Sequence, residues 1–216
     1  MNVDKLKKAV FEGNIPEVQN IVKALLEEGN NPLDILNSGL ISAMEEIGVR
    51  FKNNEIYVPE VLMSARAMKE GLNIVKPLLS AGEIGKKGCI VIGTVKGDLH
   101  DIGKNIVAIM LEGAGYRVID LGVDAAPEKF LSAVIENNAG VVALSALLTT
   151  TMPAMQTTVS LLKEQGPDNL KIMIGGAPVT KEYSNEIGSD GYSDDAGSAV
   201  DTAKELLASM GYKIKE

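Results

Sequence analysis

The sequence contains no tryptophan, a single cysteine and a single histidine, and only 4% of its 216 residues are aromatic. One cysteine cannot form a disulfide within the chain. One cysteine and one histidine cannot by themselves complete a structural zinc site. Because Cys89 opens an apolar run, we expect it to be a small residue of a hydrophobic core.

Basic residues are also few, and no long hydrophobic segment is present. The chain has 21 Lys and Arg against 29 Asp and Glu, a net charge of −8, whereas nucleic-acid binding depends on clustered basic side chains. We therefore expect no nucleic-acid partner. The charged N-terminus is not followed by an unbroken apolar stretch. We thus expect no signal peptide, no spanning helix and no membrane partner, and a cytoplasmic protein.

The length indicates two domains, because 216 residues exceed the usual single domain of roughly 100 to 150 residues. With 45% hydrophobic and 23% charged residues, the chain does not resemble a disordered one. A glycine-rich segment at residues 80–88 separates two different hydrophobic patterns. We predict a helical domain over residues 1–85 and an α/β domain over residues 86–216.

Apolar residues before the boundary recur at helical spacing. The second helix has Pro16 in its first turn and Gly29 just past its end, a common arrangement of these two residues. Short helices joined by short turns predict a four-helix bundle. The expected helical segments are residues 6–11, 16–29, 32–47 (ending before Gly48) and 58–79.

Beyond the boundary, short runs rich in Val and Ile alternate with helical stretches. Strands that are apolar on both faces are typical of a parallel sheet covered by helices on both sides. We therefore predict a doubly wound α/β domain with a five-stranded parallel sheet. The expected strands are 89–95, 117–121, 140–145, 170–174 and a weaker 191–193, and the expected helices are 102–114, 127–138, 153–165 and 199–210.

The loop after the first strand contains the only histidine, His100. Ligands of open parallel sheets bind at the carboxyl ends of strands, and this loop has neither a dinucleotide nor a phosphate-loop motif. A metal-ligating histidine usually donates its second ring N–H to a carboxylate, and Asp98 lies two residues away. One protein ligand suffices when a macrocycle already holds the metal, as in haem or a corrinoid. Taken alone, the loop fits an ordinary surface histidine or a helix cap better than a metal ligand.

Three motifs in order give the chain a strong resemblance to a known family. They are Asp98-x-His100-x-x-Gly103, then Ser145-x-Leu147, then Gly175-Gly176. Over nearly all its length the chain resembles the cobalamin-binding region of methionine synthase. It is still more similar to the corrinoid methyl carriers of methylamine, methanol and aryl methyl ether methyltransferase systems. The resemblance implies a flavodoxin-like B12-binding domain preceded by a helical cap.

The resemblance also implies roles for individual residues. His100 is expected to be the lower axial cobalt ligand of a base-off/His-on cofactor, with Asp98 and Thr151 as the catalytic hydrogen-bonding chain behind it. Phe51, Val58 and Val61 of the cap are expected to cover the upper face of the ring, although ordinary core packing is an alternative for all three. The expected cofactor-binding residues of the α/β domain are Gly97, Asp98, Leu99, His100, Asp101, Ile102, Gly103, Ser145, Leu147, Thr149, Gly175 and Gly176.

The function implied by this resemblance is to carry a methyl group on cobalt in one-carbon metabolism. The cofactor is cobalamin or a related corrinoid, cycling between cob(I)alamin and methylcobalamin. The implied partners are a substrate-specific methyltransferase, an acceptor methyltransferase and a reductive activase, so the chain is a carrier component and not an autonomous enzyme. The acceptor is tetrahydrofolate or a thiol such as coenzyme M. The methyl donor, the native lower base and the oligomeric state do not follow from the sequence.

Other functions fit the sequence less well. An adenosylcobalamin mutase needs a catalytic barrel, which 216 residues cannot also hold. A light-sensing cobalamin repressor needs a basic DNA-binding segment and usually a cap tryptophan, and this sequence has neither. A generic flavodoxin-like domain needs neither the cap nor the three motifs. The alternative kept open is a cobalamin-binding sensor or regulatory module without methyl transfer.

Overall fold

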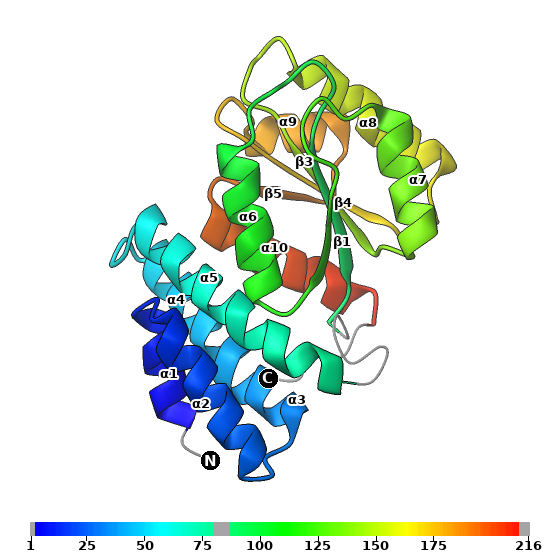
Figure 1. Ribbon diagram of the computed structural model, residues 1–216. Helices are drawn as coiled ribbons and strands as arrows, with labels where there is room; N and C mark the ends of the chain where they lie inside the picture. Colours follow the sequence, from blue (N-terminus) through cyan, green and yellow to red (C-terminus); the bar gives the residue numbers. More distant parts are fainter. Residues whose placement is uncertain (1–2, 80–86, 212–216) are drawn as a thin grey trace. The chain divides into compact units, whose positions relative to one another are not determined.

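The computed structural model describes residues 3–79 and 87–211 (Figure 1). The chain divides into two compact units, residues 1–86 with 109–115 and residues 87–108 with 116–216. The domain boundary expected between residues 85 and 86 lies outside the described residues and stays a prediction. No helix in the described ranges is both long and apolar enough to span a membrane.

Residues 3–79 form the expected bundle of four helical segments, which confirms the helical cap architecture. Pro16 lies in the first turn of the second segment, and the Asn14 side chain caps it by accepting the Glu17 N–H at 3.2 Å. The segments are α1 (Val3–Phe11), α2 (Ile15–Glu27), a continuous helix of α3 (Pro32–Asp34), η1 (Ile35–Ile41) and α4 (Ser42–Lys52), and α5 (Val58–Val75) with the 3₁₀ turn η2 (Lys76–Leu78).

The third segment is longer than predicted and contains an unexpected π-helical stretch, η1. The prediction that it ends before Gly48 is wrong, because the helix continues to Lys52. A glycine inside a helix costs only about 1 kcal/mol, and buried Met44 and Ile47 keep the apolar face of the helix in place up to this glycine. The chain turns instead after Lys52, where Asn54 adopts a positive φ of 58°.

The α/β unit has a five-stranded, all-parallel sheet in the order β2-β1-β3-β4-β5, which confirms the predicted doubly wound fold. Its strands are β1 (Cys89–Thr94), β2 (Arg117–Asp120), β3 (Val141–Ser145), β4 (Lys171–Gly175) and β5 (Gly191–Ser193). Its helices are α6 (Ile102–Gly113), α7 (Pro127–Asn137), α8 (Met152–Gln165), α9 (Lys181–Ile187) and α10 (Ala196–Ser209).

Helix α9 was not predicted. Its seven residues bury only Ser184 and Ile187, so the hydrophobic periodicity is too weak to detect. Local capping defines it instead: the Thr180 hydroxyl accepts the Tyr183 N–H at 3.2 Å, and Gly188 ends the helix in the left-handed conformation.

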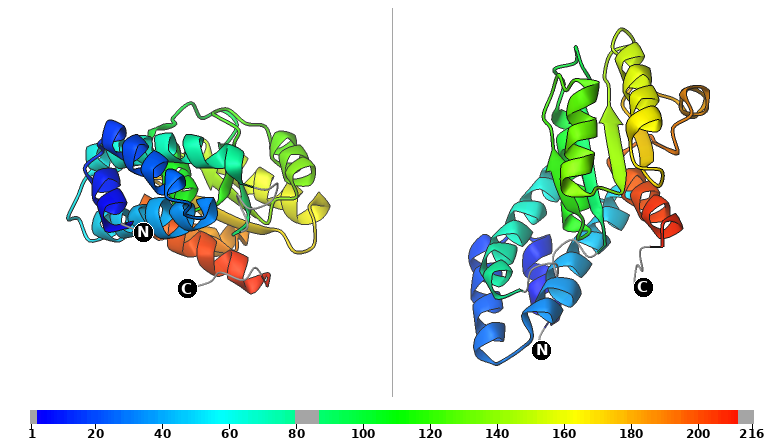
Figure 2. Two further views of the ribbon diagram at one scale, coloured as in Figure 1. Left: turned by 60° about the horizontal axis from the view of Figure 1, so that its bottom comes forward. Right: turned by 90° about the vertical axis from the view of Figure 1, so that its right-hand side faces the viewer.

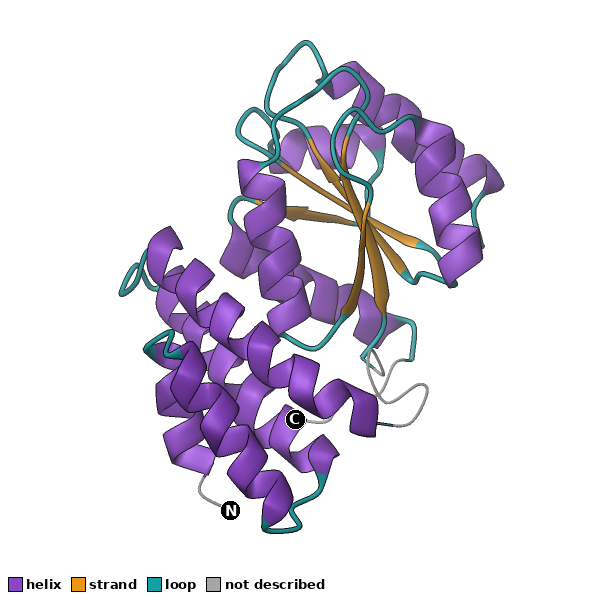
Figure 3. Ribbon diagram, in the orientation of Figure 1, coloured by secondary structure: helices purple, strands orange, loops and turns teal. Residues whose placement is uncertain are grey.

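Helices cover both faces of the sheet, as the ribbon views show (Figures 2 and 3). Helices α6 and α10 lie on one face and α7, α8 and α9 on the other (Figure 1). This arrangement follows from right-handed crossovers in a sheet whose strand order reverses direction after β2. The loops after β1 and β3 therefore leave adjacent strands in opposite directions at the carboxyl edge of the sheet.

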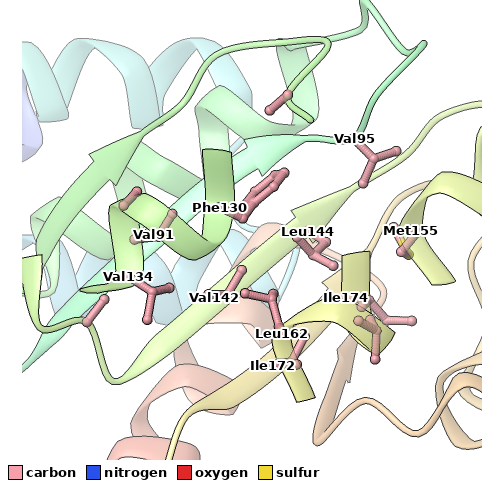
Figure 4. Packing of buried hydrophobic residues seen from close by; sticks show 14 of the residues in the cluster. Val91, Val95, Phe130, Val134, Val142, Leu144, Met155, Leu162, Ile172 and Ile174 are labelled. Carbon is pink, nitrogen blue, oxygen red and sulfur yellow. The ribbon is translucent and has the colours of Figure 1, made fainter. Parts of the chain in front are cut away.

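The face covered by α7 and α8 holds a hydrophobic core of the unit (Figure 4). Phe130 of α7 is fully buried against this face. Successive side chains of a strand point to opposite faces, so alternate strand residues belong to this core. They include Val91, Val142, Leu144, Ile172 and Ile174.

Gly93 of β1 makes room for the Phe130 ring, because a Cβ at Gly93 would lie 2.8 Å from the ring Cζ. Gly93→Ala is expected to destabilise the protein by about 1 to 3 kcal/mol through overpacking. Combining it with Phe130→Leu should recover at least about 1 kcal/mol of the summed losses. Urea unfolding of both single variants and the double variant measures this coupling, and strictly additive losses would contradict the contact.

Candidate functional site

The loops after β1 and β3 meet where the strand order changes direction, the usual ligand site of an open α/β sheet. The β1 loop contains Asp98 and His100, and the β3 loop contains Leu147, Leu148 and Thr151. Register places the last residues of the two strands, Thr94 and Ser145, side by side. Two segments about 50 residues apart in sequence are thus brought together at one edge.

The Asp98 side chain joins the two loops. It is fully buried, and both carboxylate oxygens accept hydrogen bonds. Oδ1 accepts from His100, from the ring Nδ1 at 2.7 Å and the backbone N–H at 3.1 Å. Oδ2 accepts from the Thr151 hydroxyl at 2.7 Å and from the backbone N–H groups of Leu147 and Leu148 at 2.8 and 3.3 Å.

These contacts keep Asp98 ionised. Burial by itself raises the pKa of this carboxyl, but the hydrogen bonds from Thr151, Leu147 and His100 outweigh burial and hold its pKa well below the ordinary value. An ionised carboxylate can only accept hydrogen bonds. The Nδ1 of His100 must therefore carry the proton, which leaves Nε2 of the neutral ring with a free lone pair.

The His100 ring is held at Nδ1 and is partly exposed. Its backbone carbonyl accepts the Thr94 hydroxyl at 2.8 Å, and its Nδ1 is held by Asp98. The side chain is nevertheless 50% exposed. Within residues 3–79 and 87–211, no protein group hydrogen-bonds to Nε2. The arrangement offers one oriented ring nitrogen to a ligand that arrives from solvent.

Large apolar side chains are exposed on the same two loops and at the start of α6. Leu99 and Ile102 are 72% and 76% exposed, and Leu147 and Leu148 are 43% and 42% exposed. Such clustered exposure of large apolar side chains usually marks a binding surface. Leu147 thus has two contributions, a backbone donor to Asp98 and an exposed side chain.

The expected site glycines differ in what requires them. A Cβ at Gly176 would overlap the Ala146 carbonyl, and one at Gly175 would lie 2.9 Å from the Ser193 carbonyl oxygen. The chain itself therefore requires glycine at these two positions. A Cβ at Gly103, in contrast, would meet nothing within 4 Å, and Gly103 has no positive φ. Nothing in the protein requires a glycine there, which is consistent with a ligand that approaches the first turn of α6.

The remaining expected residues of the α/β unit also lie at this edge. Ser145 is the half-buried last residue of β3, and Thr149 is exposed on the loop that follows. Asp101 precedes α6, where its carbonyl accepts the Asn105 N–H at 2.7 Å. Gly97 has a φ of +83°, a backbone conformation that favours glycine.

The three expected cap residues differ in burial. Phe51, at the end of α4, and Val58, at the start of α5, are half-buried, whereas Val61 is fully buried. The structure therefore places Val61 in a core position, which matches the alternative interpretation of that residue. A contact of any of the three with a cofactor stays a prediction.

Sequence reasoning missed three residues that hold the His100 loop. They are Thr94, which bonds the His100 carbonyl, Leu148, which donates to Asp98, and Asp124, whose side chain accepts the Gly97 N–H at 2.7 Å. Leu148 had a detectable signal, since it directly follows Leu147 in the loop after a predicted strand. Asp124 had no such signal, because it comes near Gly97 only through the pairing of β2 with β1.

The donor set suits a metal that is already held by a macrocycle. Among the described residues, no three His, Cys, Asp or Glu side chains are grouped closely enough to hold a metal ion. One imidazole nitrogen, an apolar rim and an open position at Gly103 fit a flat cofactor with a single free axial position.

Comparison with known families gives the same indication from the sequence. Two families, both described as B12 binding domain, match residues 88–201 and residues 3–76. The chain is 44% identical over 213 residues to dimethylamine corrinoid protein 1 of Methanosarcina acetivorans, covering 96% of this chain and 100% of that protein. It is 41% identical to a corrinoid protein of Desulfitobacterium hafniense, covering 95% and 97%.

Solved structures agree. A chain of the methanol:cobalamin methyltransferase complex of Methanosarcina barkeri has a TM-score of 0.88 and 33% identity, over 95% of this chain and 79% of that one. A cobalamin-binding protein of Desulfitobacterium hafniense has a TM-score of 0.77 and 28% identity, over 95% and 98%.

The hydroxyl of Thr151 is expected to stabilise the apoprotein through the Asp98 carboxylate. Thr151→Val keeps the shape of the side chain but removes the donor, so the free energy of unfolding should fall by about 1.5 to 3 kcal/mol at neutral pH. Thr151→Ser, the matched control, should lose much less. Urea unfolding of the apoproteins measures these differences.

The loss in Thr151→Val should depend on pH in a defined direction. Because the pKa of Asp98 is lowered in the folded state, its stabilisation is present above the pKa of an unfolded aspartate and is lost in acid. The difference between wild type and Thr151→Val should therefore shrink as the pH falls below about 4. A difference that grows in acid would contradict this assignment.

Proposed function

Because the chain belongs to the family of B12-binding corrinoid proteins, whose cofactor is cobalamin or a related corrinoid, we propose that it carries a methyl group on cobalt between two methyltransferases. The observation that supports this proposal most directly is the His100 imidazole. Its Nδ1 is anchored on buried, ionised Asp98, and its Nε2 is directed away from that anchor. The residues are of the kinds that a corrinoid needs: one axial nitrogen and an apolar surface around it.

In the proposed state His100 would hold the cobalt in place of the cofactor's own base. When bound, the corrinoid supplies the cobalt that accepts and releases the methyl group. The chain supplies the rest. Asp98 holds the imidazole in the tautomer with Nε2 unprotonated, and Thr151 supports the carboxylate, so the axial nitrogen keeps its orientation and basicity.

The other site residues have roles in holding the cofactor. Apolar surface comes from Leu99, Ile102 and Leu147. Because Gly103 has no side chain, the cofactor can approach the backbone of α6 there. The hydroxyls of Ser145 and Thr149 are suited to a polar nucleotide tail, beside the glycine pair at the end of β4. The cap is proposed to exclude water from the upper face through Phe51 and Val58, with Val61 supporting them.

The partners proposed are a substrate-specific methyltransferase, an acceptor methyltransferase and a reductive activase. The similar proteins are named for dimethylamine, and a similar solved structure for a methanol:cobalamin methyltransferase complex. Different methyl donors thus accompany similar carriers, which supports recognition of the donor by the partner enzyme. Tetrahydrofolate and coenzyme M are the two proposed acceptors.

The single histidine makes axial ligation testable without ambiguity. Protein labelled with ¹⁵N only at histidine and loaded with cob(II)alamin should show a doublet splitting from an axial ¹⁵N nucleus in electron paramagnetic resonance, whereas unlabelled protein should show a triplet. His100→Ala should lose the nitrogen splitting from the protein. Identical spectra for labelled and unlabelled protein would disprove ligation by His100.

Methyl transfer separates a carrier from a cobalamin sensor. The reduced holoprotein, mixed with a methyltransferase of the dimethylamine or methanol class and its ¹⁴C-methyl donor, should retain radioactivity with the protein. The apoprotein should retain only background. Release of that label to tetrahydrofolate or coenzyme M, on addition of an acceptor enzyme, then identifies the acceptor. Firm cofactor binding without labelling by any such enzyme would favour the sensor.

A further inference from the structure

The loop after β2 contacts the His100 loop from the side opposite to Thr151. Asp124 makes two hydrogen bonds in this contact. Its Oδ1 accepts the Gly97 N–H at 2.7 Å, and its own backbone N–H donates to the Asp98 carbonyl at 3.0 Å. We propose that Asp124 is a positioning residue. It sets the direction of the Asp98 side chain, and through Asp98 it sets how strongly His100 binds cobalt as the axial ligand. The role in ligation rests on the proposed function.

The two bonds act on the backbone of the residue pair that places the carboxylate. Asp124 holds the N–H of Gly97 and the carbonyl of Asp98, so it fixes both ends of this dipeptide. These backbone contacts thereby set the direction of the Asp98 Cα–Cβ bond, independently of the hydrogen bonds that the carboxylate itself accepts. Gly97, with a φ of +83°, has a wide range of other conformations when this contact is absent.

The surrounding backbone brings Asp124 to this position. Pairing between the β1 and β2 sides continues past the ends of both strands, through the Gly122 carbonyl with the Thr94 N–H and the Ala125 N–H with the Thr94 carbonyl, both at 3.0 Å. Val95 and Ala125 form an isolated parallel bridge. The β2 loop therefore runs alongside the His100 loop up to Asp98.

Asp124 itself adopts a left-handed conformation, with a φ of 50°. Aspartate and asparagine accept this conformation more readily than most residues with a side chain, and glycine adopts it freely. The side chain is exposed, so burial does not explain an aspartate there. Its structural contribution is the acceptor oxygen for Gly97, which glycine would lack and asparagine would keep.

This comparison defines three variants. Asp124→Gly relieves the backbone and removes the acceptor, whereas Asp124→Asn keeps both the acceptor and the left-handed preference. Asn138→Gly is the matched control, because Asn138 also has a positive φ, of 49°, and is exposed at the end of α7 that leads to the amino end of β3. Asp124→Ser, which shortens the acceptor, provides the same comparison if the glycine variant does not fold.

The first measurement uses the apoprotein. Hydrogen exchange at the Gly97 amide should speed up about tenfold in Asp124→Gly, as expected for loss of a charge-assisted hydrogen bond, and should be unchanged in Asn138→Gly. The second uses protein loaded with cob(II)alamin, at a pH where the wild type shows forms with and without the axial nitrogen. The ratio of the unligated to the ligated form should rise about threefold to tenfold in Asp124→Gly. It should stay within about twofold of wild type in Asp124→Asn.

The outcomes separate this inference from the proposed function. Faster Gly97 exchange with an unchanged axial ratio makes Asp124 a purely structural contact and overturns the inference. An equal change of the axial ratio in Asn138→Gly overturns the inference as well, because the change would then follow from any glycine placed at an exposed positive-φ position. If wild type shows no histidine nitrogen on cobalt, the proposed function itself fails, and the inferred role in ligation fails with it.

Discussion

The buried Asp98 carboxylate is the constraint on which the site depends. A charge taken out of water is costly unless hydrogen bonds replace its hydration. Asp98 obtains those bonds from both loops at once, from His100 on its own loop and from Leu147, Leu148 and Thr151 on the neighbouring one. The two loops are therefore tied together in the protein without its cofactor. Preorganisation of this kind reduces the ordering that a ligand would otherwise have to bring about.

Topology makes this carboxylate possible. Only adjacent strands whose crossovers go to opposite sides leave two loops facing one another at the carboxyl edge, and β1 and β3 are that pair. The β2 loop approaches from the other side of β1, where Asp124 reaches Gly97. Asp98 is thus held through its side chain by one neighbouring strand and through its backbone by the other. In consequence His100 has a rigid support behind it, although half of its own surface is exposed.

The sequence was sufficient for the features that depend on local patterns. Short Val and Ile runs predicted the strands. The three motifs predicted that Asp98, His100 and Leu147 belong to one site, and the family resemblance added Thr151; the structure brings these four together. The features that the sequence did not predict depend on contacts between distant segments or on weak hydrophobic periodicity. Asp124 reaches the site only because β2 pairs with β1 and not with β3, and α9 is set by its caps. Gly175 and Gly176 were expected only as cofactor-binding residues, and nothing in the sequence indicated that the backbone of Ser193 and Ala146 requires glycine there.

The support behind His100 also bears on specificity. Every hydrogen bond found around the imidazole acts on its Nδ1 or on the backbone of its loop. The large apolar side chains exposed on the two loops and at the start of α6 are Leu99, Ile102, Leu147 and Leu148. In the proposed carrier these side chains would lie on the His100 side of the cofactor, whereas the methyl group would be carried on the opposite side, so they have no contact with which to distinguish an amine from an alcohol as methyl donor. In the proposed carrier, selection of the donor must therefore come from the protein that presents it, which agrees with the similarity of this chain to corrinoid proteins named for dimethylamine and to a structure named for methanol.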